Sequence, residues 1–261
     1  MIGKLMKYDL KKMTNLLIYL YPIAVCLALI TRLINIGKDI QLVFIIGQVF
    51  AGITYSLIAN ILVNTFVQIL TTFNRSFYKD ESYLTHTLPV SKKQLLDSKY
   101  LSAFIVIVVS MIVSVLCLFI VLYTKEFANV IKTVISQVVL GFDVSGTAFI
   151  VMIAGVLFAQ ICFLMSIGFT AIIKSRTYQE KKVLKGLGWF AIFYLGAAIV
   201  SLIVISLVFA ITGSIDLIFA EVLPSEQFLS IIIIGGVLYF IYAVIFYLIS
   251  NRMFDKGVNV D

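Results

Sequence analysis

Residues 75–99 read RSFYKDESYLTHTLPVSKKQLLDSK and separate two long apolar runs. This segment carries eight of the 33 charged residues and the only histidine of the chain. Elsewhere the chain is mostly apolar: 62% of its 261 residues are hydrophobic and 13% are charged. An average soluble domain is about half apolar and a quarter charged. The composition therefore indicates a membrane protein in which residues 75–99 lie outside the hydrocarbon.

Six apolar runs are each long enough to cross a membrane. About 20 helical residues span ~30 Å of hydrocarbon, and only a helix satisfies its backbone hydrogen bonds within one such span. We predict an all-α integral membrane protein, formed by one transmembrane domain over residues 1–261. Its six transmembrane helices are expected at residues 16–36, 42–70, 100–123, 147–173, 187–211 and 228–249.

Lys and Arg are unevenly distributed among the segments between these runs. The segments at both termini, between the second and third runs and between the fourth and fifth runs hold 16 of them, and the others hold 4. The positive-inside rule then places both termini and residues 75–99 in the cytoplasm. The net charge of +7 follows from this topology and from attraction to anionic lipid, and it requires no nucleic acid.

Several features are expected around the spans. Residues 1–14 are predicted to form an amphipathic elbow helix on the inner membrane surface, with a frayed tail as the alternative. Residues 124–146 repeat apolar side chains at helical spacing and predict an outer amphipathic helix. Residues 212–227 contain Pro224 and are interpreted as an outer re-entrant hairpin before the sixth span. In the fifth span, the small residues Gly188, Gly196, Ala197 and Ala198 predict close helix packing.

Within residues 75–99 the pattern predicts a short helix between two long ones. Asp80 is expected to cap it, with Glu81 in its first turn near the positive end of the helix dipole. Pro89 ends it, and Ser91 with Gln94 matches the capping box of the next helix. One apolar face of the short helix is expected to be exposed to a soluble partner or to lie against neighbouring helices. This face consists of Tyr83, Leu84, Thr87 and Leu88.

The second run carries a polar stripe at i,i+4 spacing, on one side of its helix. The stripe consists of Ser56, Asn60, Asn64 and Gln68. Amide groups facing lipid are costly, so the stripe is expected to face protein or water. It either lines a translocation path or a dimer seam, or it forms hydrogen bonds within one chain.

The sequence offers little support for catalysis or for ATP binding. The phosphate-loop pattern G-x-x-x-x-G-K-[ST] and the zinc pattern H-E-x-x-H are both absent. The single histidine, His86, has no Cys or His cluster around it in the sequence, so we expect no metal, no cofactor and no catalytic residue on this chain. A secondary transporter or channel is a further alternative, although we find no acidic residue deep in a span to couple ions.

The segment from Asp80 to Lys99 resembles the cytoplasmic signature of membrane subunits of type-2 ATP-binding-cassette exporters. The matching residues are Asp80-Glu81, Tyr83-Leu84, Thr87-Leu88-Pro89-Val90-Ser91, Leu95-Leu96 and Ser98-Lys99. The tail from Asn251 to Val260 is similar to the ending of many such permeases. The resemblance implies that Asp80–Leu88 is a coupling helix that sits in a groove on an ATPase. The residues expected to contact the ATPase are Tyr78, Asp80, Glu81, Tyr83, Leu84, Thr87, Leu88 and Pro89.

The same resemblance implies a non-catalytic permease subunit in a bacterial cytoplasmic membrane. ATP and Mg would bind to two separate ATPase subunits, and a second copy of the permease would complete a dimer, with a homodimer preferred to a heterodimer. Within that family, the small size and the expected lack of an extracellular domain look most like exporters of amphipathic peptides, such as phenol-soluble modulins and antimicrobial peptides. Lipid-like and drug substrates are the alternatives within that family.

Overall fold

The computed structural model describes residues 2–37, 40–79, 81–87, 89–123, 125–142, 144–178, 180–212 and 224–255. These residues form helices and turns, and no strand occurs among them. The chain divides into two compact units, which we call unit 1 (Met1–Asn129) and unit 2 (Val130–Asn259). The all-helical class predicted from the sequence is therefore confirmed for the described ranges.

Among the described residues, six helices are long and apolar enough to cross a membrane, as predicted. They are α2 (Leu17–Ile36), α3 (Gln41–Tyr78), α5 (Lys92–Leu122), α7 (Gly146–Ser175), α8 (Lys182–Ile211) and α9 (Ser225–Asp255). The other helices are α1 (Ile2–Met13), α4 (Ser82–His86) and α6 (Lys125–Phe142). Because α3 and α5 both continue past their apolar runs, they hold α4 beyond the apolar part of unit 1.

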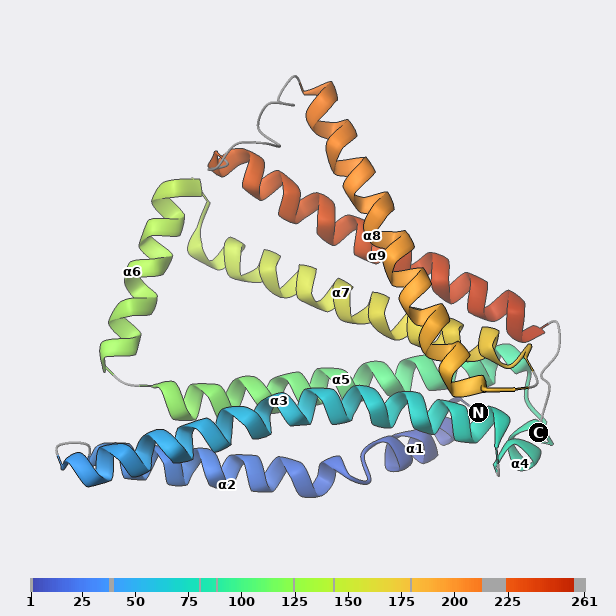
Figure 1. Cartoon of the computed structure of the whole chain (residues 1–261), viewed down its shortest axis with the longest axis horizontal. Helices are drawn as coiled ribbons and strands as arrows, with labels where there is room; N and C mark the ends of the chain where they lie inside the picture. The colour runs from blue at the N-terminus through green and yellow to red at the C-terminus, as the bar shows by residue number, and fades with distance from the viewer. Residues whose placement is uncertain are drawn as a thin grey trace. The chain divides into compact units, whose positions relative to one another are not determined.

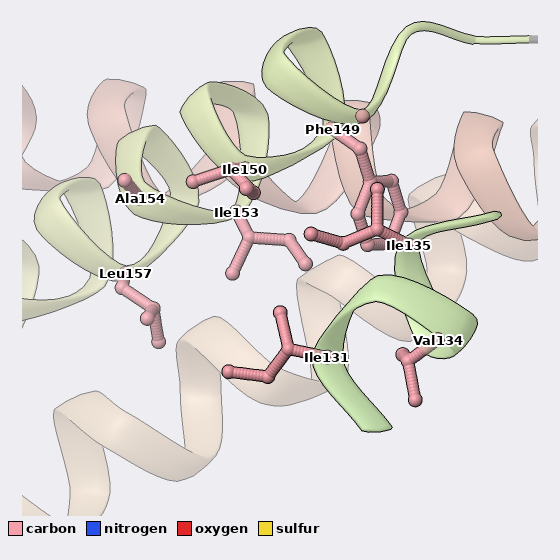
Figure 2. A pocket seen from close by; sticks show the side chains of 9 residues that line it. Ile131, Val134, Ile135, Phe149, Ile150, Ile153, Ala154 and Leu157 are labelled. Atoms are coloured by element: carbon pink, nitrogen blue, oxygen red, sulfur yellow. The ribbon is translucent and has the colours of Figure 1, made fainter. Parts of the chain in front are cut away.

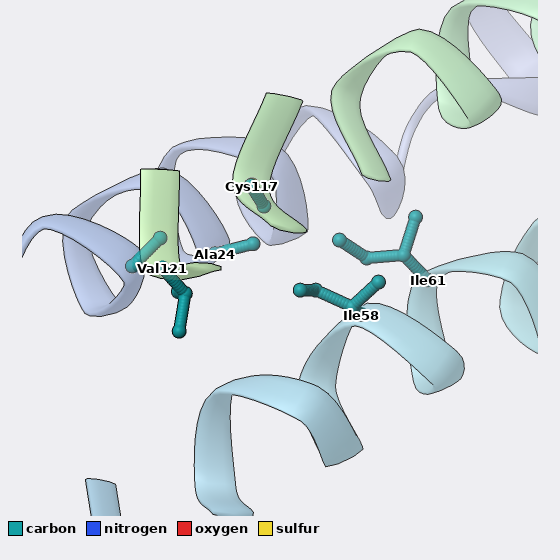
Figure 3. Packing of buried hydrophobic residues seen from close by; sticks show 6 residues of the cluster. Ala24, Ile58, Ile61, Cys117 and Val121 are labelled. Atoms are coloured by element: carbon teal, nitrogen blue, oxygen red, sulfur yellow. The ribbon is translucent and has the colours of Figure 1, made fainter. Parts of the chain in front are cut away.

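In unit 1, α2, α3 and α5 run side by side, with α3 antiparallel to the other two (Figure 1). A buried apolar cluster lies between them, and it includes Ala24, Ala28, Ile58, Ile61, Cys117 and Val121 (Figure 3). The alanines of α2 leave room for close contact, which favours association of helices in lipid through van der Waals packing. This cluster is the apolar core that fixes the three spans of unit 1.

Hydroxyl groups connect the same three spans. The Tyr21 hydroxyl lies 2.6 Å from the Ser110 Oγ, which lies 2.8 Å from the Thr65 Oγ1. Nearer the other end of α2, the hydroxyl oxygens of Thr31 and Thr54 are 2.9 Å apart. A polar group in an apolar environment is costly unless it is hydrogen-bonded. These hydroxyl groups therefore fix the relative register of α2, α3 and α5.

In unit 2, α7 packs along both α8 and α9 (Figure 1). The parallel register of α7 and α9 is set by the Thr170 hydroxyl, which lies 2.7 Å from the Ser250 Oγ. Phe163 of α7 also packs against α9, with ring centroids 5.4 Å from Tyr239 and 5.6 Å from Tyr242. Unit 2 is thus built around α7.

The prediction of close helix packing in the fifth span is confirmed at Ala197, which lies in a buried cluster with Phe163 and Tyr242, but it is wrong within this chain at Gly188 and Gly196. A Cβ atom added at either glycine would meet nothing within 4 Å. The close approach occurs instead at Gly236 of α9, where an added Cβ would lie 2.8 Å from the Cγ2 of Val156. The buried small residue of α8 is Ala197. Composition alone does not say which face of a helix is covered, because this depends on its neighbours.

A helix is found where the outer amphipathic helix of residues 124–146 was predicted: α6 runs from Lys125 to Phe142. Its place on the outer side stays a prediction. Ile131, Val134 and Ile135 lie with residues of α7 around an apolar pocket of about 390 Å³ (Figure 2). The predicted re-entrant hairpin of residues 212–227 lies mostly outside the described residues, which resume at Pro224. The same holds for the tail from residue 256 onward.

Candidate functional site

The candidate site lies at the end of unit 1 where α3, α4 and α5 meet. After α3 ends at Tyr78, Ser82 donates its backbone N–H to the Lys79 carbonyl at 2.7 Å. The five-residue helix α4 follows, and Ser91 then accepts a hydrogen bond from the Gln94 backbone N–H at 3.3 Å. The predicted cap at Ser91 is therefore confirmed. The short helix is held by turns that begin and end on long helices.

The predicted start of the short helix needs correction. The helix begins at Ser82, with Glu81 in the N-cap position and without a side-chain capping bond. Asp80, which was expected to cap it, lies outside the described residues. The Glu81 carboxylate is instead turned toward α1 and α3, where it accepts hydrogen bonds from Lys12 and from Ser76. Glu81 thus connects α4 to its neighbours.

The residues expected to contact a soluble partner differ in exposure. Tyr83 is 77% exposed, and Thr87 and Pro89 are also exposed. Tyr78 is only 1% exposed and lies beside Phe77 with ring centroids 6.4 Å apart. We therefore remove Tyr78 from the docking surface, because a buried ring cannot contact a partner. Asp80 and Leu88, and the side chain of Leu84, lie outside what the structure describes.

A buried ion pair that the sequence analysis missed lies next to this segment. The Lys99 ammonium of α5 donates to the Asp9 carboxylate of α1, and both residues are buried. Ser98 donates to the other oxygen of Asp9 at 3.0 Å, and Lys99 also donates to the Ser76 Oγ of α3 at 2.9 Å. The pair therefore joins three helices, and removal of one partner would leave a buried charge uncompensated.

A second ion pair, between Lys12 of α1 and Glu81, lies nearer the surface. Partial burial of the Glu81 carboxyl raises its pKa, but the hydrogen bond and positive charge of Lys12 lower it, helped by Lys99 and Ser76. The pKa of Glu81 consequently lies below its ordinary value. The carboxylate is thus charged at neutral pH and ties α1 to the turn before α4.

The polar stripe of α3 has two parts. Ser56 and Asn60 are exposed, while Asn64 and Gln68 are half-buried. Asn64 donates to the Asn60 carbonyl at 3.0 Å, within the same helix. Gln68 donates to the backbone carbonyl of Lys12 in α1 at 3.3 Å. Packing within the chain therefore accounts for Gln68, whereas Ser56 and Asn60 leave a polar surface on a candidate span.

Asp9 carried a signal that could have found the buried pair. It lies four residues after Leu5 and four before the fully buried Met13, so it interrupts the apolar face of α1. A carboxylate on the buried side of a helix requires a cationic partner. Lys99, at the polar start of α5, is such a partner, but nothing in the local sequence connects two residues 90 positions apart.

The part of the chain that the structure describes is all-helical, with six candidate membrane-spanning helices and a charged end on unit 1. No protein-family model, no curated protein and no solved structure matches this chain. Within the described ranges, no three His, Cys, Asp or Glu residues lie close enough together to hold a metal ion. What the site does is therefore argued from its geometry.

Proposed function

We propose that the chain is the membrane-spanning subunit of an ATP-driven exporter in a bacterial cytoplasmic membrane. In this proposal both termini and α4 lie in the cytoplasm, and α4 docks on a separate ATPase that binds ATP and Mg. The observation that carries the proposal is the exposed ring of Tyr83 on a short helix between two long candidate spans. An exposed aromatic residue on such a projection is typical of a docking anchor.

The contacts of the site support a path for motion from α4 to the spans. A displacement of α4 would move the ends of α3 and α5 directly, because only short turns separate them. It would also act on α1 through the contact of Glu81 with Lys12, and the Asp9–Lys99 pair makes α1 move with α5. An ATPase that closes on ATP could in this way reorient the three spans of unit 1.

For the cargo we propose amphipathic peptides. The exposed Asn60 lies on the same helix as exposed apolar side chains such as Val63 and Ile53, so this face offers both amide groups and hydrocarbon. An amphipathic helix requires both kinds of contact. The polar stripe then lines the path, or the seam with a second copy of the chain, where its amide groups avoid lipid.

The test begins with the tagged chain purified from the membranes of its native host. The proposal predicts a co-purifying ATPase subunit, and inside-out vesicles containing both should take up a labelled amphipathic peptide only with ATP and Mg. Replacing Asn60 and Asn64 by Leu should reduce uptake and retain the ATPase, whereas replacing exposed Ile53 and Val63 by Leu is the matched control. Uptake driven by an ion gradient without ATP would favour a secondary transporter instead.

A further inference from the structure

Unit 1 has a basic pocket of about 420 Å³ between α1 and α3, and the proposed function assigns no role to two of its cations, Lys11 and Arg75. Its charged lining consists of Lys11, Lys12, Arg75 and Glu81. Three cations and one carboxylate leave this lining with an excess of positive charge. The pocket therefore favours an anionic ligand.

The four charges do not all compensate one another. Lys12 forms an ion pair with Glu81, and the Lys12 backbone is fixed to α3 by the hydrogen bond from Gln68. Within the described part of the chain, neither Lys11 nor Arg75 forms an ion pair, and both are exposed. The Arg guanidinium matches the geometry of phosphate oxygens, to which it donates two parallel hydrogen bonds. Lys11 and Arg75 are thus available to a phosphate group.

The surroundings of the pocket match a lipid better than a free ion. The pocket lies where α2 begins at Leu17 and where α3 passes from apolar residues to Thr72 and Arg75. Val67, on the preceding turn of α3, is exposed hydrocarbon. Tyr8, also in the lining, is 68% exposed, and tyrosine is enriched at the membrane–water interface.

We propose that this pocket binds the phosphate headgroup of an anionic phospholipid, whose acyl chains lie along the exposed hydrocarbon of α3 next to the pocket, at Val67. The site is independent of the proposed function and of the orientation of the chain, because it needs only the boundary between hydrocarbon and water. Free inorganic phosphate offers similar oxygens to Lys11 and Arg75 but has no acyl chain to bury. Binding of a phospholipid can therefore be distinguished from binding of free phosphate.

The experiment measures lipid bound to the purified full chain in detergent by native mass spectrometry. The probes are phosphatidylglycerol and the zwitterionic phosphatidylcholine. The test variant combines Lys11→Gln with Arg75→Gln. The matched control combines Lys7→Gln with Lys79→Gln, which removes two exposed charges from the same two regions outside the pocket. A rescue variant, Lys11→Arg with Arg75→Lys, keeps both charges.

We expect the apparent affinity for phosphatidylglycerol to exceed that for phosphatidylcholine and to fall about 10- to 30-fold in the test variant. The control should change it less than about threefold, and the rescue variant should restore most of it. Equal losses in the test and control variants would overturn the site in favour of diffuse charge attraction. Displacement of the lipid by inorganic phosphate at low millimolar concentration would overturn the lipid assignment in favour of the free ion. Because all four residues are exposed, an unchanged melting temperature is expected and checks the fold.

Discussion

The α4 end of unit 1 and the loop between α7 and α8 in unit 2 hold their basic residues in different ways. In unit 1, Lys99 and Lys12 are paired with the carboxylates of Asp9 and Glu81. In unit 2, Lys174 lies 5.4 Å from the ring centroid of Trp189 and Lys185 lies 4.2 Å from that of Tyr178. Both regions are rich in Lys and Arg, and both are predicted to be cytoplasmic.

The partners also differ in how far apart they are in the chain. The ion pairs of unit 1 join residues 90 and 69 positions apart, so they connect separate helices. The aromatic contacts of unit 2 join neighbours within one helix–loop–helix segment. The two ion pairs of unit 1 therefore connect helices that are far apart in the sequence. Motion at α4 can reach α1, α3 and α5 through them. The ring contacts of Lys174 and Lys185 in unit 2 are local, which fits a topology anchor.

The largest expected effect tests whether both regions lie on the same side of the membrane. Ser82 is only 2% exposed and is a poor labelling site, so Tyr83→Cys, Val183→Cys and Gln137→Cys are used in a background with Cys26, Cys117 and Cys162 replaced by Ala. In intact cells an impermeant maleimide should label position 137 and leave the other two protected. If one of positions 83 and 183 is labelled and the other is protected, the two regions lie on opposite sides of the membrane and the comparison fails.

The buried pair of unit 1 should matter far more to stability than the aromatic contacts of unit 2. Asp9→Asn should destabilise the chain by about 3–5 kcal/mol, because it leaves the Lys99 charge buried without its partner. Lys185→Gln should cost ~1 kcal/mol or less. Thermal unfolding in one detergent measures both. The double variant Asp9→Leu with Lys99→Met should recover much of the lost stability. If Asp9→Asn and Lys185→Gln destabilise the chain equally, the proposed difference between the two regions is wrong.

The packing of unit 2 is tested by a pair of glycines. Gly236→Ala brings a methyl group against Val156 and should destabilise unit 2 by about 1–3 kcal/mol. Gly196→Ala meets open space and should be neutral or stabilising by up to ~1 kcal/mol, because alanine favours a helix. Melting temperatures of the two variants provide the measurement. If Gly196→Ala proves the more damaging change, a partner covers that face of α8.

Some of these features can be predicted from the sequence, and others depend on how the helices meet. Hydropathy identifies the six spans, and the local pattern at Ser91 identifies its cap, because both depend on neighbouring residues. The Asp9–Lys99 pair depends on three helices meeting, and no local pattern contains it. Tyr78 was expected to contact the ATPase because of the family resemblance, yet its ring is buried. The docking face and the polar stripe stay predictions until a partner is identified.

The smallest expected effect concerns pH. The Glu81 pKa lies below its ordinary value, so its pairing with Lys12 stabilises the fold at pH values above the ordinary Glu pKa of about 4.3. That contribution is lost as the pH falls through the lowered pKa. Glu81→Gln should therefore cost ~1 kcal/mol or less at pH 7, and the difference should close under more acidic conditions. A difference that persists at acid pH would show that the charge of Glu81 is not its cause.

The central claim is that α4 docks on a separate ATPase, and binding of that ATPase to two tyrosine variants tests it most directly. Tyr83→Ala removes the 77% exposed ring of α4, and the control Tyr19→Ala removes a 69% exposed ring of α2. We predict that Tyr83→Ala weakens binding by about 2 kcal/mol or more, roughly a 30-fold rise in Kd. Tyr19→Ala should leave the affinity unchanged. Wild-type affinity in the Tyr83→Ala variant, with both proteins folded, would contradict the claim and leave the loop between α7 and α8 as the next docking candidate.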